Sequence, residues 1–283
     1  MNSKLGFVIA LLLLPLSGCA LVSVGYNYAD VYLRYSINSY ASFTDTQKEV
    51  IKNDVNNFMQ WHRKSMLPEY VSFLQELKQV AQSGAPLKKE EVTRFRTEVR
   101  NLYFKTVQPA IRPSASLLAD LDPAQIQEIE KSFSKENGKQ RKKELSGNQD
   151  EQLRKRAERT IDFIENLVGG LNDDQLDKIR TMNNKLPYAT VLYIELREAN
   201  QARLIEMLRS RKGEDDIAAL LTAWLYTPEA GKSADEISLM RTFENSSDEM
   251  IANIYQMLTE RQKEKLQKSI LKYIATFQEL ASH

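Results

Sequence analysis

The sequence contains little of the residue types on which metal sites, disulfide-bonded domains and many active sites depend. Cys19 is the single cysteine among 283 residues, so the chain can form neither an internal disulfide nor a zinc site built from several cysteines. The two histidines, His62 and His283, supply too few ligands for a zinc ion. Glycine is scarce, with 10 residues, which limits the flexible loops that commonly carry active sites. The composition therefore predicts no metal ion.

The sequence motifs of common enzymes are also missing. There is no Gly-x-Ser-x-Gly elbow, no glycine-rich phosphate loop and no His-Glu-x-x-His pair. A formal net charge of +1 argues against a nucleic-acid partner. The hydrophobic share of 42% and the charged share of 27% are ordinary for a globular fold. These features favour a binding protein over an enzyme, and we expect no catalytic residues and no cofactor.

A short hydrophobic segment lies at the start of the chain. Lys4 precedes apolar residues 5–16, and Leu16-Ser17-Gly18-Cys19 follows. The segment is shorter than the roughly 20 residues needed to span a bilayer. A charged start, a short apolar core and small residues before a cut site are typical of a secretory signal. Because it ends in cysteine, the segment resembles the bacterial lipoprotein signal, which implies cleavage after residue 18 and lipidation of Cys19.

The same resemblance implies a location. Residue Ala20 stands where such lipoproteins carry Asp when they are retained in the inner membrane, so the implied address is the periplasmic face of the outer membrane. Several acyl chains anchor a protein stably, because each buried methylene contributes about 0.8 kcal/mol. Removal of residues 1–18 leaves 38 basic and 38 acidic side chains. The expected partners are the membrane, through the lipid anchor, and an envelope protein of unknown identity, with no nucleic acid.

Apolar residues recur at three- and four-residue steps along most of the chain, which is the period of an α-helix. The last segment shows this most clearly, with Leu266, Ile270, Tyr273, Ile274, Phe277 and Leu280. No window alternates with a period of two, so nothing indicates a sheet. The sequence therefore predicts an all-α fold, an elongated multi-helix bundle behind a lipidated N-terminal tether.

The chain divides into a signal peptide (1–18), a lipidated tether with a first helical segment (19–42) and an α-helical domain (43–283). Residues 20–27 form the expected tether. Five tyrosines then fall close together, and their spacing favours a helix packed on the body over rings placed at a lipid interface. These are Tyr26, Tyr28, Tyr32, Tyr35 and Tyr40.

Prolines and a polar stretch are expected to interrupt the helices. Pro109 and Pro113 should break or kink a helix over 88–120, and Pro187 should bend a long helix over 173–211. Residues 134–159 carry nine basic and five acidic side chains. Such a run indicates a solvated helix or a mobile loop, and contact with an anionic surface is the alternative.

One local motif occurs four times, each time as a cap residue followed three residues later by glutamine. This spacing is typical of a capping box, in which the cap side chain accepts from the N3 amide and the glutamine accepts from the amide of the cap. If these residues serve only as caps, replacing Thr259 with Ala should cost about 1 kcal/mol and replacing Gln262 less. The four pairs are Thr44 with Gln47, Asp122 with Gln125, Asn172 with Gln175, and Thr259 with Gln262.

The motif has a functional interpretation as well as this structural one. Leu258-Thr259-Glu260-Arg261-Gln262 is similar to the Leu-Thr-x-x-Gln signature of the Spy-like periplasmic chaperones, which are helical, cysteine-free cradles. The other three copies replace the Leu by Phe or the Thr by Asp or Asn. The glutamines are separated by 78, 50 and 87 residues, so they do not mark a solenoid of constant period.

A second resemblance rests on residues that follow the first capping motif. Trp61-His62-Arg63 and Leu67-Pro68-Glu69-Tyr70, together with the Cys19 motif, resemble an uncharacterised family of helical proteobacterial lipoproteins. The resemblance covers the mature chain and implies no activity.

The chemistry of Trp61, His62 and Arg63 allows two interpretations. His62 has the side chain of a general acid or base, with Asp54 or Glu69 to orient it, and Arg63 has the fork that binds phosphate or carboxylate. Alternatively the residues form a packed corner in which Trp61 is buried, which we favour because nothing nearby completes a catalytic set. The sequence thus predicts an envelope protein-interaction or chaperone-like module. An enzyme or ligand-binding protein centred on His62 and Arg63 is the alternative.

Overall fold

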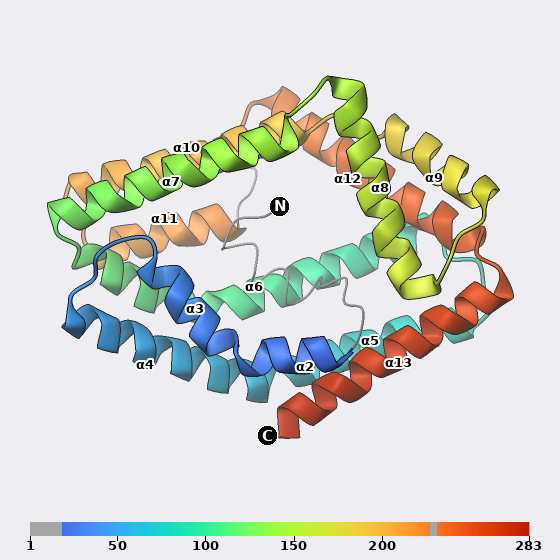
Figure 1. Cartoon of the computed structure of the whole chain (residues 1–283), viewed down its shortest axis with the longest axis horizontal. Helices are drawn as coiled ribbons and strands as arrows, with labels where there is room; N and C mark the ends of the chain where they lie inside the picture. The colour runs from blue at the N-terminus through green and yellow to red at the C-terminus, as the bar shows by residue number, and fades with distance from the viewer. Residues whose placement is uncertain (1–18, 227–230, 283) are drawn as a thin grey trace.

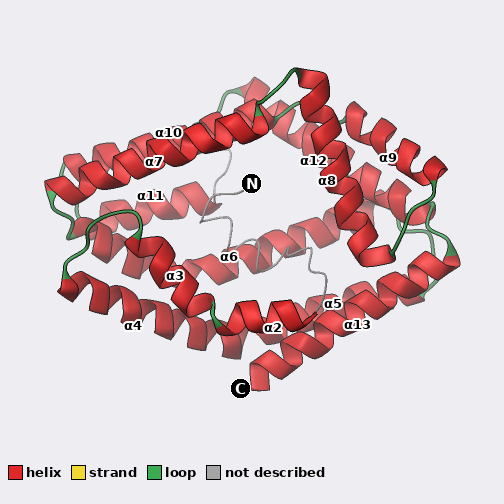
Figure 2. Cartoon of the chain, viewed as in Figure 1, coloured by secondary structure: helices red, strands yellow, loops and turns green. Residues whose placement is uncertain are grey.

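The computed structural model describes residues 19–226 and 231–282, and all regular secondary structure in these ranges is helical (Figure 2). The all-α multi-helix prediction is therefore confirmed. In chain order the elements are α2 (Cys19–Asn27), α3 (Ala29–Asn38), α4 (Asp45–Trp61), the π-helical turn η1 (His62–Met66), α5 (Leu67–Gln82), α6 (Lys89–Ala119), α7 (Pro123–Glu144), α8 (Gln149–Val168), α9 (Asp173–Lys185), α10 (Thr190–Arg209), α11 (Glu214–Tyr226), α12 (Ala234–Gln256) and α13 (Glu260–Ser282). The signal peptide expected over 1–18 lies outside the described residues.

Four clusters of buried apolar side chains hold the helices together, and we call the two largest the two cores. The first gathers side chains of α4, α6, α7, α10 and α11, including Ile51, Ile126 and Ile217. The second gathers side chains of α6, α8, α9 and α12, including Ile164 and Ile179. In Figure 1, α7 and α10 follow one side of the molecule, α4, α5 and α13 follow the opposite side, and α8, α9 and α12 close one end. Helix α6 is the element that both cores share.

Helix α6 runs without interruption through both of its prolines, so the expected break is wrong. An interior proline removes one backbone hydrogen bond and crowds the carbonyl four residues earlier. Here the helix is held by its packing: Ile111 and Ala115 are buried in the first core, and Val92 and Phe95 in the second. Tertiary burial of one face outweighs the local cost, as it does in most protein helices.

The long helix expected over 173–211 is two helices, α9 and α10, separated by residues 186–189. Pro187 disfavours helical geometry in the residue before it, and Leu186 is indeed extended, with φ −65° and ψ 137°. The Arg156 guanidinium, from α8, donates to the carbonyls of Asn183 at 2.5 Å and of Leu186 and Pro187 at 3.2 Å. Arg156 therefore satisfies carbonyl groups that the end of α9 leaves open.

The polar stretch over 134–159 is helical, not a mobile loop. Its first part belongs to α7 and its second part to α8, with a short turn over 145–148 between them. Arg141 binds both carboxylate oxygens of Glu198 on α10, at 2.8 and 2.6 Å. Arg159 lies 3.2 Å from Glu144. Part of the basic charge in this stretch is therefore neutralised within the chain.

The tether expected over 20–27 is instead helix α2, which packs on the body. Val22 and Tyr26 are buried, and α2 lies beside α13 near the end of the chain (Figure 1). None of the described helices combines the length and apolar character needed to cross a membrane. The helix that begins at Cys19 is thus part of the folded body.

Candidate functional site: a histidine corner and two glutamine pairs

The corner at Trp61-His62-Arg63 is built on a π-helical turn. The amide of Leu67 donates to the carbonyl of His62, five residues earlier, so the chain stays helical from Asp45 to Gln82. Pro68 explains the wider turn: it has no N–H, and its ring crowds the carbonyl of Lys64 in ordinary helical geometry. The extra residue relieves this conflict and directs His62 into the interior, where it is 5% exposed.

Both ring nitrogens of His62 are hydrogen-bonded to tyrosine hydroxyls. Nδ1 lies 2.9 Å from the Tyr26 hydroxyl of α2, and Nε2 lies 3.2 Å from the Tyr70 hydroxyl of α5. Tyr70 in turn lies 2.5 Å from Thr106 Oγ1 of α6. One buried chain of polar groups therefore joins α2, η1, α5 and α6.

The direction of the protons along this chain follows from Thr106. Its hydroxyl donates to the Leu102 carbonyl at 2.8 Å, so its oxygen accepts from Tyr70. The Tyr70 oxygen then accepts from Nε2–H of His62, and Nδ1 accepts from the Tyr26 hydroxyl. His62 is thus the neutral tautomer that carries its proton on Nε2.

Burial sets the ionisation of the same groups. It lowers the pKa of His62 from 6.5 to about 4, because the imidazolium ion is poorly solvated in the interior. It also raises the pKa of Tyr26 and of Tyr70, so both hydroxyls stay protonated near neutral pH. The carboxylates considered as orienting partners do not take that role: Glu69 pairs with Lys105 at 3.1 Å, and tyrosines engage both nitrogens of His62.

Arg63 extends the corner to both ends of the described chain. Its guanidinium donates to the Leu280 carbonyl at 3.2 Å and to Asn27 Oδ1 at 3.4 Å, and it lies 5.2 Å from the centre of the Tyr26 ring. The fork that the sequence offered to a phosphate or carboxylate therefore binds α2 and α13.

Trp61 is not the main buried residue of the corner. It is half-buried, with its ring 5.9 Å from that of Phe58 and 6.4 Å from that of His62. Leu67 at 1% exposure and Tyr70 at 4% lie deeper, and Pro68 lies on the exposed side of the turn. The buried centre of the corner is formed by Leu67 and Tyr70, so the expectation that Trp61 is its buried residue is wrong.

All four predicted capping motifs stand at helix starts, and the hydrogen bonds of a capping box are present in each. They precede α4, α7, α9 and α13, with both reciprocal bonds between 2.8 and 3.3 Å. The glutamines are buried as well, between 3% and 8% exposed. A side chain that served only as a cap would have no reason to be buried, which points to a further contact.

That contact is a mutual pairing of the glutamine amides. Gln47 and Gln125 donate to each other's Oε1 at 3.3 and 2.7 Å, and Gln175 and Gln262 do so at 2.8 and 2.9 Å. The first pair joins the start of α4 to that of α7, and the second joins the start of α9 to that of α13. We call these the glutamine pairs.

The remaining N–H of each amide reaches a carbonyl two residues before the partner's cap. In the first pair Gln47 donates to Asp120 at 3.3 Å and Gln125 to Ser42 at 3.1 Å. In the second pair Gln175 donates to Met257 at 2.9 Å and Gln262 to Gly170 at 3.0 Å. The same four-residue arrangement is therefore built twice, and each amide satisfies both of its N–H groups.

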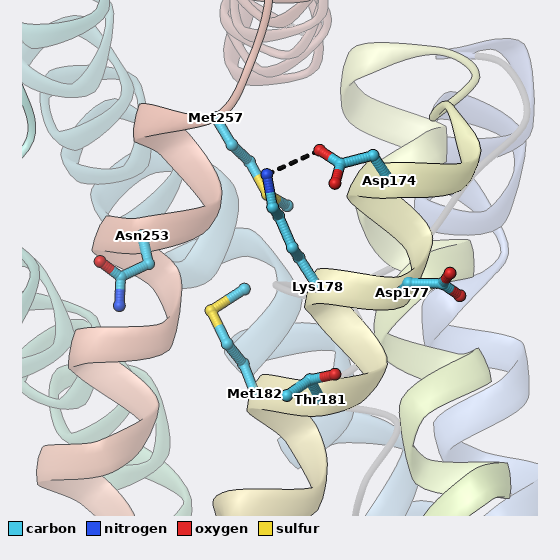
Figure 3. Close-up of a pocket in the computed structure, with 7 residues that line it drawn as sticks. All are labelled: Asp174, Asp177, Lys178, Thr181, Met182, Asn253 and Met257. Carbon is cyan, nitrogen blue, oxygen red and sulfur yellow. Dashed lines mark hydrogen bonds and ion pairs between the residues drawn. The ribbon is translucent and has the colours of Figure 1, made fainter.

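A groove between α9 and α12 gathers none of these corner or motif residues (Figure 3). Its charged groups include a pair within one helix, in which Lys178 Nζ lies 2.6 Å from Asp174 Oδ2. The described residues include no group of three or more His, Cys, Asp or Glu side chains placed to hold a metal ion. The lining residues are Asp174, Asp177, Lys178, Thr181, Met182, Asn253 and Met257.

Comparison with models of known protein families gives a match. A model described as a family of unknown function (DUF6279) matches residues 39–230, about two thirds of the chain. The match includes His62, Arg63, Tyr70 and Thr106 of the corner, but neither Tyr26 nor Leu280. No curated protein and no solved structure matches the sequence.

The glutamine pairs reverse the order of effects expected from capping alone. We predict that Gln262→Ala lowers the free energy of unfolding by about 2–3 kcal/mol, more than the ~1 kcal/mol expected for Thr259→Ala, because it strips buried partners as well as a cap. Denaturant unfolding of a Gln175→Ala and Gln262→Ala double-mutant cycle should give a coupling energy of roughly 1–3 kcal/mol. Gln47→Ala with Gln262→Ala, taken from different pairs, is the control and should be additive. Additivity within a pair would contradict the coupling.

The lowered pKa of His62 predicts a pH-dependent stability. In the unfolded chain the histidine has a pKa near 6.5, whereas in the native state His62 binds a proton only near pH 4. Between these two pH values the unfolded state binds more protons, so stability falls as the pH drops from about 6.5 to about 4. The loss between pH 7 and pH 4.5 is on the order of 2–3 kcal/mol. His62→Gln lacks this contribution, and its unfolding free energy should depend less on pH by that amount. Parallel pH dependences for the two proteins would show that His62 is not buried as a neutral ring.

Proposed function

The chain belongs to DUF6279, a family of unknown function, and on that premise we propose that it is an envelope protein held by a lipidated Cys19 at the periplasmic face of the outer membrane. Its helical body acts as a protein-interaction module. The side chains of His62 and Arg63 serve to fix α2, the helix that begins at Cys19, to this body.

The observation that carries the proposal is the engagement of His62. One ring nitrogen binds Tyr26, on the helix that begins at Cys19, and the other binds Tyr70 in the interior. A general acid or base must exchange its proton with a substrate, whereas here tyrosine hydroxyls already occupy both ring nitrogens. The arrangement supports a structural role for the residue that was the best candidate for catalysis.

Arg63 supports the same role. By binding Asn27 and the Leu280 carbonyl, it joins the C-terminal end of α2 to the last turn of α13. Because α2 is packed in this way, the body can take only a limited range of orientations relative to the membrane. A body on a flexible tether would take many more. A defined orientation suits a protein that meets partners within the envelope.

Burial of the glutamine pairs limits how the chaperone-like form of the proposal can work. A client cannot reach amides that are 3–8% exposed and already bonded to each other. In this proposal the motif that resembles the signature of the Spy-like chaperones acts through stability, and client contacts lie on the outer faces of the helices.

The anchor is tested by replacing its acceptor. Cys19→Ala should abolish incorporation of a palmitate analogue and leave an unprocessed precursor at the inner membrane. Metabolic labelling and membrane fractionation measure both effects, with Ser23→Ala, four residues further along α2, as the control that keeps the label. Continued labelling of the Cys19→Ala protein would refute lipidation at this residue.

The role of His62 is tested with two variants of the same hydrogen bond. Tyr26→Phe removes only the hydroxyl that donates to Nδ1, and His62→Gln removes the ring. If the corner is structural, both lower the melting temperature, and complementation of a deletion strain declines in step with that loss. If His62 is instead a catalytic residue, His62→Gln stays folded and fails to complement, while Tyr26→Phe retains function at equal stability. The second pattern would replace our proposal with the enzyme alternative.

A further inference from the structure

The outward face of α2 and α3 carries apolar and aromatic side chains. Val24, Tyr28, Val31 and Tyr35 are 54%, 65%, 50% and 69% exposed. Their steps of four, three and four residues place them along one side of a helix. Helical hydrogen bonds run through the junction between α2 and α3, from Tyr28 N to the Val24 carbonyl at 3.2 Å and from Tyr32 N to the Tyr28 carbonyl at 3.0 Å. We call these four side chains the outer stripe.

The opposite side of the same segment is already buried in the body. Val22, Tyr26, Ala29 and Ser36 are each 5% exposed or less. A surface helix of a globular protein normally pairs such a face with a polar outer face. The outer stripe therefore needs an explanation that packing on the body does not supply.

No charged side chain is fully exposed on this segment. The residues open to solvent over 22–38 are the stripe with Gly25, Asn27 and Asn38. The charged residues there, Asp30 and Arg34, are partly buried and neutralise each other through a 2.8 Å ion pair. The face is thus uncharged in a protein of which 27% is charged.

The stripe is also concentrated, because it supplies four of the nine large apolar side chains that are exposed among the described residues. The other five, Val50, Phe163, Tyr193, Ile251 and Leu271, are spread over five helices. Apolar residues scattered singly on a surface need no explanation, whereas a contiguous set marks an interaction surface.

We propose that the outer stripe lies on the lipid surface, with its rings and valines at the boundary between head groups and acyl chains. This rests on the proposed lipid at Cys19, the first residue of α2. Nine residues at about 1.5 Å each place Tyr28 within roughly 14 Å of that anchor. Because α2 is fixed to the body, the stripe must stay near the bilayer that holds the acyl chains.

A lipid surface fits this face better than a second copy of the chain does. Tyrosine is stable where one end of the ring is apolar and the other is wet, as at the membrane interface. Four side chains on one narrow segment offer much less than the ~800 Å² per partner of a stable protein interface. The acyl chains already supply the binding free energy, so the stripe sets the orientation of the body.

The experiment uses the lipidated full-length chain in vesicles of phosphatidylethanolamine and phosphatidylglycerol. An acylated Cys19 has no free thiol, so one introduced cysteine is the only site for a nitroxide label. Val31→Cys reports on the stripe, and Ile251→Cys on α12 is the matched control, since the two native side chains are 50% and 47% exposed. Tyr28→Cys provides a second stripe position if Val31→Cys perturbs the fold.

We expect the ratio of oxygen collisions to water-soluble nickel-complex collisions to be several-fold higher at Val31→Cys than at Ile251→Cys. Equal ratios, with an acyl mass on Cys19, would overturn the stripe proposal and leave the proposed function intact. Spin–spin broadening between Val31→Cys labels at low protein density would assign the face to a second copy, and so overturn it too. A wild-type chain without the acyl mass would overturn the proposed function and, with it, this inference.

Discussion

The glutamine pairs are the interaction on which the arrangement of the helices depends. A buried amide is tolerated only when its donors and acceptor are bonded, and here that requires two helix starts to meet in one orientation. Apolar contacts are not directional, so apolar side chains alone would not fix the orientation in which the start of α4 meets that of α7, or the start of α9 that of α13. The reciprocal bonds of Gln47 with Gln125 and of Gln175 with Gln262 fix each meeting point. Residues next to these meeting points, such as Phe43, Leu121 and Leu258, are buried in the two apolar cores.

Local features of the fold followed from the sequence, whereas contacts between distant segments did not. Helix starts were predictable because a cap and its glutamine are three residues apart. The pairing of those glutamines joins residues 78 and 87 apart, and four similar motifs allow several pairings, so no local rule selects the right one. The effect of each proline also depended on contacts between distant segments. Packing of Ile111 and Ala115 keeps α6 helical through two prolines, whereas Pro187, where a bend was expected, lies just beyond the end of α9, whose carbonyls Arg156 binds.

The corner shows the same division. Its residues stood out in the sequence as a Trp-His-Arg cluster before a proline, but the partners of His62 are tyrosines, not the carboxylates that proximity in sequence suggested. Tyr26 lies 36 residues before His62, in a stretch whose position behind the lipid signal indicated a tether. The burial of Tyr26 could not be predicted from its own segment, because α13 and η1, which are distant in sequence, form the surface on which α2 packs.

Each group in the hydrogen-bond chain has a fixed role as donor or acceptor. The contact between α2 and the body is therefore sensitive to the protonation of His62 and to the position of α2. The hydrogen-bond chain starts at Tyr26 and ends at Thr106 on α6, the one helix that contributes to both cores. Protonation of Nδ1 would turn the Tyr26 hydroxyl from donor to acceptor and leave its proton without its buried partner. Displacement of α2 would remove the Tyr26 donor from the buried Nδ1 of His62, and this cost opposes movement of α2 relative to the body. For a chain held by lipid at Cys19, as we propose, the membrane would then set the orientation of both cores.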